Sequence, residues 1–346
     1  MDAAASDEPI LWAGLAGFTS AERARIAQLM QAREGPRWRL AAFADADAWI
    51  VNGGRVRPMG EDAIQVLPAM PREAILKIHL ADVTRPVAFA TPLPMAFEPL
   101  CRFNAANDAS IEQMLDRFDD WLQPLRAQFA LGRQLALRTR LPRRGVVHVT
   151  RDGRLLATLD LRSGMAGLAP DLQPAALDGA HWERRPPSAG DPPSVFYGST
   201  LAQLGWTYVR HSDARLLPPR YRYRTIYYRG APRVPIEWLS DSQLQLLREV
   251  ATGSCTIEVL RQRTGMAMEQ VEKDLACLYA ASAITTTLAK AARRLASGAT
   301  ESPSSLPATA DILEPEDRQV VTEPGPLVPH AISRQFHPVP APQMAP

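Results

Sequence analysis

The clearest apolar pattern in the chain lies between Leu239 and Thr287. Ser240 and Gln243 have the spacing of a capping box, in which the serine hydroxyl accepts the Gln243 N–H and the glutamine side chain reaches back. Apolar residues then recur at helical spacing as far as Gly253. The pattern predicts a first helix that stops at this glycine.

Two more helices are predicted after this first one. A short helix is capped by Ser254 or Thr256 and ends at Gly265. A longer helix runs from about Ala267 to Ala281, because apolar residues recur there on one side. The apolar residues of this third helix are Met268, Val271, Leu275 and Leu278.

The order helix, short helix, glycine turn, helix and β-branched strand at 283–287 resembles a winged-helix domain, in the degenerate form that ends many bacterial signalling proteins. In a DNA-binding member of this family the exposed face of the third helix approaches phosphates. Here we expect that face to carry Glu269, Gln270, Glu272, Lys273 and Asp274. Since acids predominate, we predict that this winged-helix-like α domain, residues 239–296, binds protein and not duplex DNA.

The first hundred residues have the pattern of an α/β sheet. The apolar runs predict strands at 10–15, 38–43, 47–53, 63–67 and 86–90. Thr19 and Glu22 have capping-box spacing, which predicts a helix from there to about Ala32. A strand, a helix and further buried strands in this order imply an α/β domain.

Residues 1–106 resemble a degenerate response-regulator receiver domain. The segment DAWIVNG, residues 47–53, corresponds to the family's third strand, which ends on the phospho-accepting aspartate; that position is Asn52 here. The acidic pair that holds the metal in this family would fall near Gly14 to Gly17, where the chain has no acid. The resemblance therefore implies a receiver-like fold without phosphorylation and without Mg²⁺.

A helical connector is predicted for residues 107–144. Asp108 and Ser110 open a helix that spans about 111–138, and Pro124 should kink it or split it in two. The helix either covers the sheet, which is the commoner arrangement, or forms the seam of an oligomer.

Residues 145–238 have the pattern of a small β-hairpin and basic-aromatic region. Asp152 and Gly153 form the turn of a hairpin, and 164–168 adds a third strand. A helix is predicted from about 199 to 212.

The segment 210–233 concentrates arginine and tyrosine. Arg220, Arg222 and Arg224 alternate with Tyr221 and Tyr223, so that in a strand the arginines would share one face and the tyrosines the other. Arg229 and Arg233 continue the positive charge. These seven residues are the candidate ligand- or phosphate-binding site, suited to phosphate, a nucleotide or single-stranded nucleic acid. The alternative interpretation is an ordinary half-buried strand, which shows the same alternation.

Composition adds limits to this picture. The net charge of +2 over 346 residues provides no general attraction to nucleic acid or membrane. The three cysteines lack metal or disulfide spacing, which favours buried packing residues in a reducing cytoplasm. The beginning of the chain has no secretory signal, and no apolar run is long enough for a membrane span. After Ser297 the composition predicts a disordered tail, 297–346.

The sequence contains no recognised catalytic motif, and its six histidines are scattered singly. We therefore assign no catalytic residue, no metal ligand and no cofactor. The leading hypothesis is a cytoplasmic bacterial regulatory or scaffolding adaptor that binds an unidentified protein partner. One alternative is a regulator that binds DNA or a cyclic dinucleotide through the 210–233 segment, and a second is an enzyme of unrecognised type.

Overall fold

The computed structural model describes residues 8–34, 37–60, 63–71, 73–93, 99, 101–138, 145–185 and 193–292. The described residues divide into two compact units. The N-terminal unit contains Ile10–Gln123, and the C-terminal unit contains the described residues from Pro124 onward together with Glu8 and Pro9. The predicted tail, 297–346, lies outside the described residues. Within these ranges, no helix has both the length and the apolar character needed to cross a bilayer.

The N-terminal unit is built on a parallel sheet in the order β2-β1-β3-β7-β8. Its strands are β1 (Ile10–Ala16), β2 (Arg37–Ala41), β3 (Ala48–Asn52), β7 (Val87–Ala90) and β8 (Arg102–Phe103). Numbered by their succession within this sheet, the strands have the order 2-1-3-4-5, which is that of flavodoxin-like sheets. The strands predicted at 10–15, 38–43, 47–53 and 86–90 are confirmed as β1, β2, β3 and β7.

The strand predicted at 63–67 forms, but it does not belong to the parallel sheet. It is β5 (Ala63–Val66), which pairs antiparallel with β4 (Val56–Pro58) and β6 (Leu76–His79) in a separate sheet. Its alternating burial, with Ile64 and Val66 inward, is that of a sheet with one covered face. The antiparallel strands β4, β5 and β6 therefore form the connection between β3 and β7, which a doubly wound fold makes with a helix.

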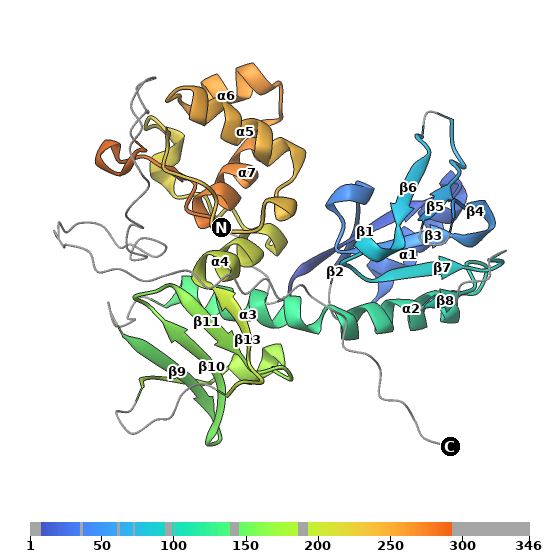
Figure 1. The fold of residues 1–346 in the computed structure, drawn as a ribbon, viewed down its shortest axis with the longest axis horizontal. Helices are drawn as coiled ribbons and strands as arrows, with labels where there is room; N and C mark the ends of the chain where they lie inside the picture. The colour runs from blue at the N-terminus through green and yellow to red at the C-terminus, as the bar shows by residue number, and fades with distance from the viewer. Residues whose placement is uncertain are drawn as a thin grey trace. The chain divides into compact units, whose positions relative to one another are not determined.

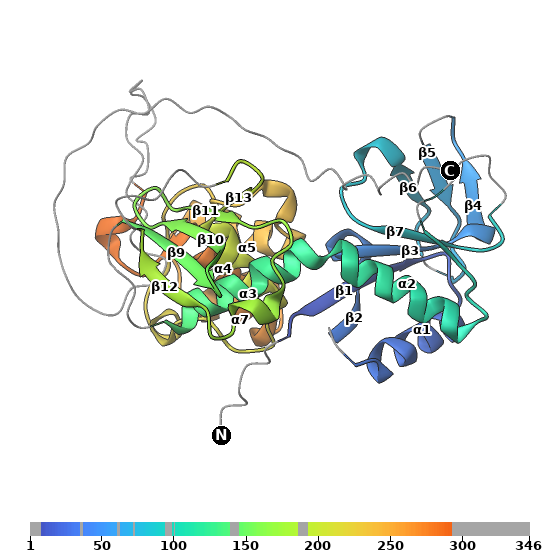
Figure 2. The same cartoon turned by 90° about the horizontal axis from the view of Figure 1, so that it is seen from below.

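Among its described residues, the N-terminal unit has two α-helices, α1 (Ser20–Ala32) and α2 (Asp108–Trp121). Thr19 caps α1, and its backbone N–H donates to Glu22 at 2.8 Å, so the predicted capping box is confirmed. Figure 2 shows α1 and α2 side by side on one face of the parallel sheet, with β4–β6 on the opposite side. The core between the two sheets contains Ala16, Val51, Val56, Ile64, Val66, Ile78 and Phe89.

The long helix predicted for 111–138 is split, as expected from Pro124. Helix α2 ends at Trp121, and α3 (Gln123–Leu137) begins two residues later. Pro124 thereby lies in the first turn of α3, where its missing N–H has no intrahelical partner to lose. The boundary between the two units falls at the same place, inside the segment interpreted as a connector.

After α3, the C-terminal unit continues with a five-stranded antiparallel sheet, which has two more strands than the hairpin and third strand predicted. Its order is β12-β9-β10-β11-β13. The strands are β9 (Val146–Arg151), β10 (Arg154–Asp160), β11 (Met165–Leu168), β12 (His181–Arg184) and β13 (Tyr197–Thr200). The predicted turn is confirmed, since Asp152 and Gly153 have φ angles of 51° and 75°, as a two-residue hairpin loop requires.

Three helices complete the C-terminal unit as the apolar pattern predicted: α5 (Asp241–Thr252), α6 (Ile257–Thr264) and α7 (Met268–Ala280) (Figure 1). Ser240 caps α5 with the predicted capping box, and Gly265 ends α6 with a φ of 70°. The strand after α7 is β15 (Ile284–Thr285), which pairs with β14 (Tyr227–Tyr228). The partner strand of β15 thus comes from before α5.

Helix α4 (Leu201–His211) joins the antiparallel sheet to the three-helix part. Its residues Leu201 and Leu204 belong to the core beneath the sheet, which α3 also enters. Its residues Trp206 and Val209 belong to the core formed with α5, α6 and α7. One helix therefore contributes to both hydrophobic cores of the unit.

Candidate functional site

The arginine–tyrosine segment between α4 and α5 is not the strand that the alternation predicted. Pro219–Arg222 forms a short 3₁₀ helix. Pro218 and Pro219 fix φ and remove two backbone donors, which disfavours pairing in a sheet. The two tyrosines consequently do not share a face: Tyr221 is 1% exposed and Tyr223 is 70% exposed.

Tyr221 is a core residue of the C-terminal unit. Its ring meets that of Tyr279 edge-on, with centroids 5.3 Å apart, and its hydroxyl donates to the Ile284 carbonyl at 3.3 Å. Burial raises the pKa of Tyr221 well above its ordinary value. The residue thus anchors the segment on α7 and β15 and offers no stacking surface to a ligand.

The arginines next to Tyr221 are turned toward α7. The Arg220 guanidinium lies 5.7 Å from the ring centroids of both Tyr221 and Tyr279. Arg222 forms an ion pair with Glu272, with Nε and Oε1 2.9 Å apart, and the Glu272 side chain is only 15% exposed. A further pair joins Arg215 to Glu269 at 3.5 Å.

The remaining candidate residues are spread along the segment. Arg224 is exposed. The backbone N–H groups of Arg229 and Arg233 donate to the carbonyls of Ala283 and Ala281, each at 2.8 Å. The segment therefore brings Arg220 and Arg222 together with acids and aromatic rings of α7, and it does not present the seven residues as one surface.

Helix α7 is the buried centre of its part of the unit. Among its residues only Glu269 and Gln270 are exposed. Three residues predicted on an exposed face were placed wrongly: Asp274 is 2% exposed, and Glu272 and Lys273 are only partly exposed. The prediction was wrong because α7 is buried on more than its apolar side. Helix α4 packs against a side of α7 that carries polar residues and was therefore predicted to be exposed.

Lys273 closes the C-terminal end of α4. Its Nζ donates to the backbone carbonyls of Val209 and Ser212. Carbonyls at the end of a helix have no N–H partner within the helix, so a side chain can supply the missing donor. Burial lowers the pKa of Lys273. The side chain therefore works as an internal helix cap between α4 and α7.

Asp274 lies beside Lys273 in a buried polar network. It accepts hydrogen bonds from Gln243 Nε2 at 3.2 Å and from Gln270 Nε2 at 2.8 Å. Gln243 itself is 1% exposed and also completes the capping box of α5. The network connects the start of α5 to the middle of α7. Its hydrogen bonds supply the partners that a buried carboxylate requires.

The cysteines fit the prediction of packing residues, since Cys101, Cys255 and Cys277 are free thiols and buried. Burial raises the pKa of Cys277 to about 12, which keeps the thiol protonated near neutral pH.

The carboxyl edge of the parallel sheet is the place where open α/β sheets bind ligands. Asn52 ends β3, and its Oδ1 accepts the Gly54 N–H at 3.1 Å. A Cβ at Gly53 would lie 2.2 Å from the Ala90 carbonyl oxygen, so the chain after β3 runs directly against the chain after β7. After β1, Gly17 has a φ of 75°, and a Cβ there would meet Arg55 and Val66 at 3.0 and 3.1 Å. Side chains of the β4–β6 region thus cover this edge.

The sequence was enough to find the arginine–tyrosine segment but not the residues that it contacts. The arginines were recognisable from composition, but their partners Glu272 and Tyr279 lie fifty and fifty-nine residues later and have no local signal. No local signal indicates the hydrogen bond between Gln243 and Asp274 either.

Neither a protein-family model, nor a curated protein, nor a solved structure was found to match this chain.

Proposed function

We propose that the chain is a cytoplasmic, non-enzymatic regulatory adaptor that acts by contact with another protein. In this proposal the N-terminal unit is receiver-like, and the part built from α5, α6 and α7 is winged-helix-like. The observation that carries the proposal is the burial of α7, the helix that would have to enter the major groove in a DNA-binding winged helix. Its two exposed residues are an acid and an amide, and duplex phosphates repel the acid.

The arginines of the 210–233 segment support the same choice. Arg222 and Arg215 are paired with Glu272 and Glu269 of α7, so that binding of phosphates would first require these pairs to be broken. At the sheet edge, Asn52 stands where the receiver family has its phospho-acceptor, which favours an unphosphorylated domain that signals through its surface.

Duplex binding by the full chain is the test. A labelled duplex of mixed sequence is followed by fluorescence anisotropy at about 50 and 200 mM salt, conditions between which contacts to phosphates weaken strongly. We expect no sequence preference at either salt concentration. A partner captured from native lysate should remain bound after nuclease treatment.

Arg224→Gln is the informative variant, because Arg224 is the exposed arginine next to the paired ones. If the chain binds nucleic acid through this segment, the substitution lowers the slope of log K against log salt by about 0.7 to 0.9. That result, or specific binding of a duplex at physiological salt, contradicts the adaptor proposal and favours a nucleic-acid-binding regulator.

A further inference from the structure

Two arginines in the segment before α5 lack a carboxylate partner. The backbone N–H of Arg224 donates to the Arg220 carbonyl at 3.0 Å, so the two residues lie one turn apart at the end of the short 3₁₀ helix. Among the residues that the structure describes, neither guanidinium forms an ion pair with a carboxylate. Like charges one turn apart repel each other, which favours the approach of an anion.

An exposed aromatic ring accompanies these arginines. Tyr223 is 70% exposed, and Arg224 beside it is exposed as well. The Arg222 side chain remains 46% exposed although it is paired with Glu272. We call Arg220, Arg222, Tyr223 and Arg224 the basic turn. Tyrosine and arginine are enriched among the residues that dominate the binding energy of protein contacts, so the basic turn has the composition of a docking site for an acidic segment.

The last residue that the structure describes lies close to the basic turn. The Ala292 N–H donates to the Tyr228 carbonyl at 2.9 Å. Tyr228 follows Arg224 by four positions, so the two residues are within about 14 Å of each other even along a fully extended chain. The chain beyond Ala292 therefore starts near the basic turn, in the same compact unit.

The sequence beyond Ala292 contains an acidic segment. Residues 311–317 read DILEPED, with four carboxylates and no basic residue. Asp311 follows Ala292 by nineteen positions, and nineteen residues span up to about 65 Å. This length is several times the distance from Ala292 to the basic turn, so the acidic segment can reach it.

The tether between Ala292 and the acidic segment favours contact within one chain. Two elements joined by a short linker meet at an effective concentration of the order of mM. An ion-pairing contact with a dissociation constant of only about 1 mM is then enough to keep the segment bound for much of the time. The chemistry also matches, because carboxylates pair with guanidinium groups and Ile312 and Leu313 offer apolar side chains to an aromatic ring.

We propose that residues 311–317 dock on the basic turn of the same chain. The carboxylates of the segment pair with Arg220 and Arg224, and its two aliphatic side chains contact the ring of Tyr223. The composition of residues 297–346 predicts a disordered tail, and the proposal assigns a binding site to one part of it. This contact needs no partner and is independent of the adaptor proposal. While the segment is docked, it closes the basic turn to other anions.

Photo-cross-linking in the full chain tests the proposal. Tyr223→p-benzoylphenylalanine places a reactive aromatic group on the basic turn, and mass spectrometry locates the residues to which it links. We expect links to 311–317 at about five times the yield from the same group at Met165, which is 50% exposed on β11 of the same unit. Raising the salt from about 50 to about 500 mM should reduce the yield about twofold or more, because screening weakens ion pairs between exposed groups.

Neutral substitutions in the acidic segment separate loss of the contact from loss of the fold, because they change no residue that the structure describes. Glu314→Gln, Glu316→Gln and Asp317→Asn together should lower the yield about threefold or more, since the amides keep the shape of the side chains but not the charge. The matched control combines Glu301→Gln with Glu323→Gln. These acids lie on either side of the segment, so the yield should be unchanged.

The arginine side of the contact has a control of its own. Arg224→Gln should lower the yield, whereas Arg248→Gln, which changes an exposed arginine of α5, should not. A mixture of ¹⁵N-labelled and unlabelled chains distinguishes links within a chain from links between chains. Products that combine both labels would overturn the proposal and identify a second copy as the occupant. Links that avoid 311–317, or that persist after its carboxylates are neutralised, would contradict it as well.

Discussion

Gly132 sets how closely α3 and α4 approach each other. A Cβ at this position would lie 2.2 Å from the Leu204 carbonyl oxygen and 3.1 Å from the Cβ of Tyr208. Both obstacles are parts of α4, and the nearest is backbone, which cannot rotate away. The absence of a side chain at this one residue therefore determines the packing of the layer beneath the antiparallel sheet.

Gly132→Ala should lower the free energy of unfolding by about 1–3 kcal/mol, the usual range for overpacking a core. Alanine is otherwise about 1 kcal/mol better than glycine inside a helix, so a net loss measures the packing conflict directly. Urea unfolding provides the measurement. Gly198→Ala is the matched control, because a Cβ there meets no atom within 4 Å, and its effect should stay within about 0.5 kcal/mol.

His148 makes the stability of the C-terminal unit depend on pH. The residue lies in β9 and is 8% exposed, and its pKa is lowered from 6.5, first by burial and then by the charge of Arg185. The unfolded chain therefore takes up a proton near pH 6.5 while the folded chain does not. The contribution of this histidine is fully present above pH 6.5 and is lost as the pH falls toward the folded-state pKa.

His148→Gln should reduce this loss of stability between about pH 7.5 and 5.5, since the variant has no proton to bind there. Urea unfolding of both proteins across this range measures the difference. An NMR titration provides an independent reading, and a folded-state pKa of His148 above 6.5 would reverse the expected sign.

At the scale of elements, helix starts differ in how strongly a side chain caps them. Ser240 accepts the Gln243 N–H at 3.3 Å at the start of α5, whereas Thr256 at the start of α6 makes no side-chain cap bond. Ser240→Ala should therefore lower the free energy of unfolding by about 1 kcal/mol. Thr256→Ala should have a clearly smaller effect in the same denaturant experiment; equal effects would show that the hydroxyl of Ser240 is not what stabilises α5.

Elements set by local signals were predictable from the sequence. The capping boxes at Thr19 and Ser240, the turn at Asp152 and the break at Pro124 all depend on residues within four positions of each other. Such signals act on the chain before any tertiary contact forms, and the structure contains each of them.

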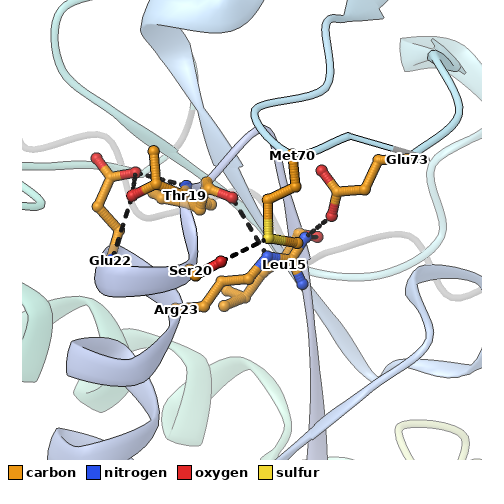
Figure 3. A network of polar contacts seen from close by, with 8 residues as sticks. Leu15, Thr19, Ser20, Glu22, Arg23, Met70 and Glu73 are labelled. Carbon is orange, nitrogen blue, oxygen red and sulfur yellow. Dashed lines mark hydrogen bonds and ion pairs between the residues drawn. The ribbon is translucent and has the colours of Figure 1, made fainter.

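Elements set by distant partners were not predictable. The alternation of Arg220 to Arg224 has the period of a strand, but the two prolines before it and the contacts of Tyr221 with α7 determine a 3₁₀ helix. Strand β5 has a normal strand pattern, yet only its pairing with β4 and β6 reveals that it leaves the parallel sheet. For the same reason the ion pair of Arg23 with Glu73 was not predicted, because the two residues are fifty positions apart in the sequence (Figure 3).

At the scale of the whole molecule, the pattern of shared cores predicts which fragments fold. The core around α7 includes Trp206, Val209, Tyr221 and Ile226, all of which precede α5. A fragment limited to residues 239–287 lacks these side chains, so we expect it to give no cooperative thermal transition. A fragment of residues 124–292 contains both cores of the C-terminal unit and should unfold cooperatively; circular dichroism during heating distinguishes the two outcomes.

Helix α4 has a consequence for the motions of the C-terminal unit. Its sheet-facing and bundle-facing residues are buried in different cores, and Lys273 closes its C-terminal end. Water reaches the backbone amides of such a helix only when both of its neighbours separate from it. Hydrogen exchange at the centre of α4 should therefore be among the slowest in the chain and should follow global opening, so that the sheet and the three helices behave as one cooperative unit on the timescale of exchange.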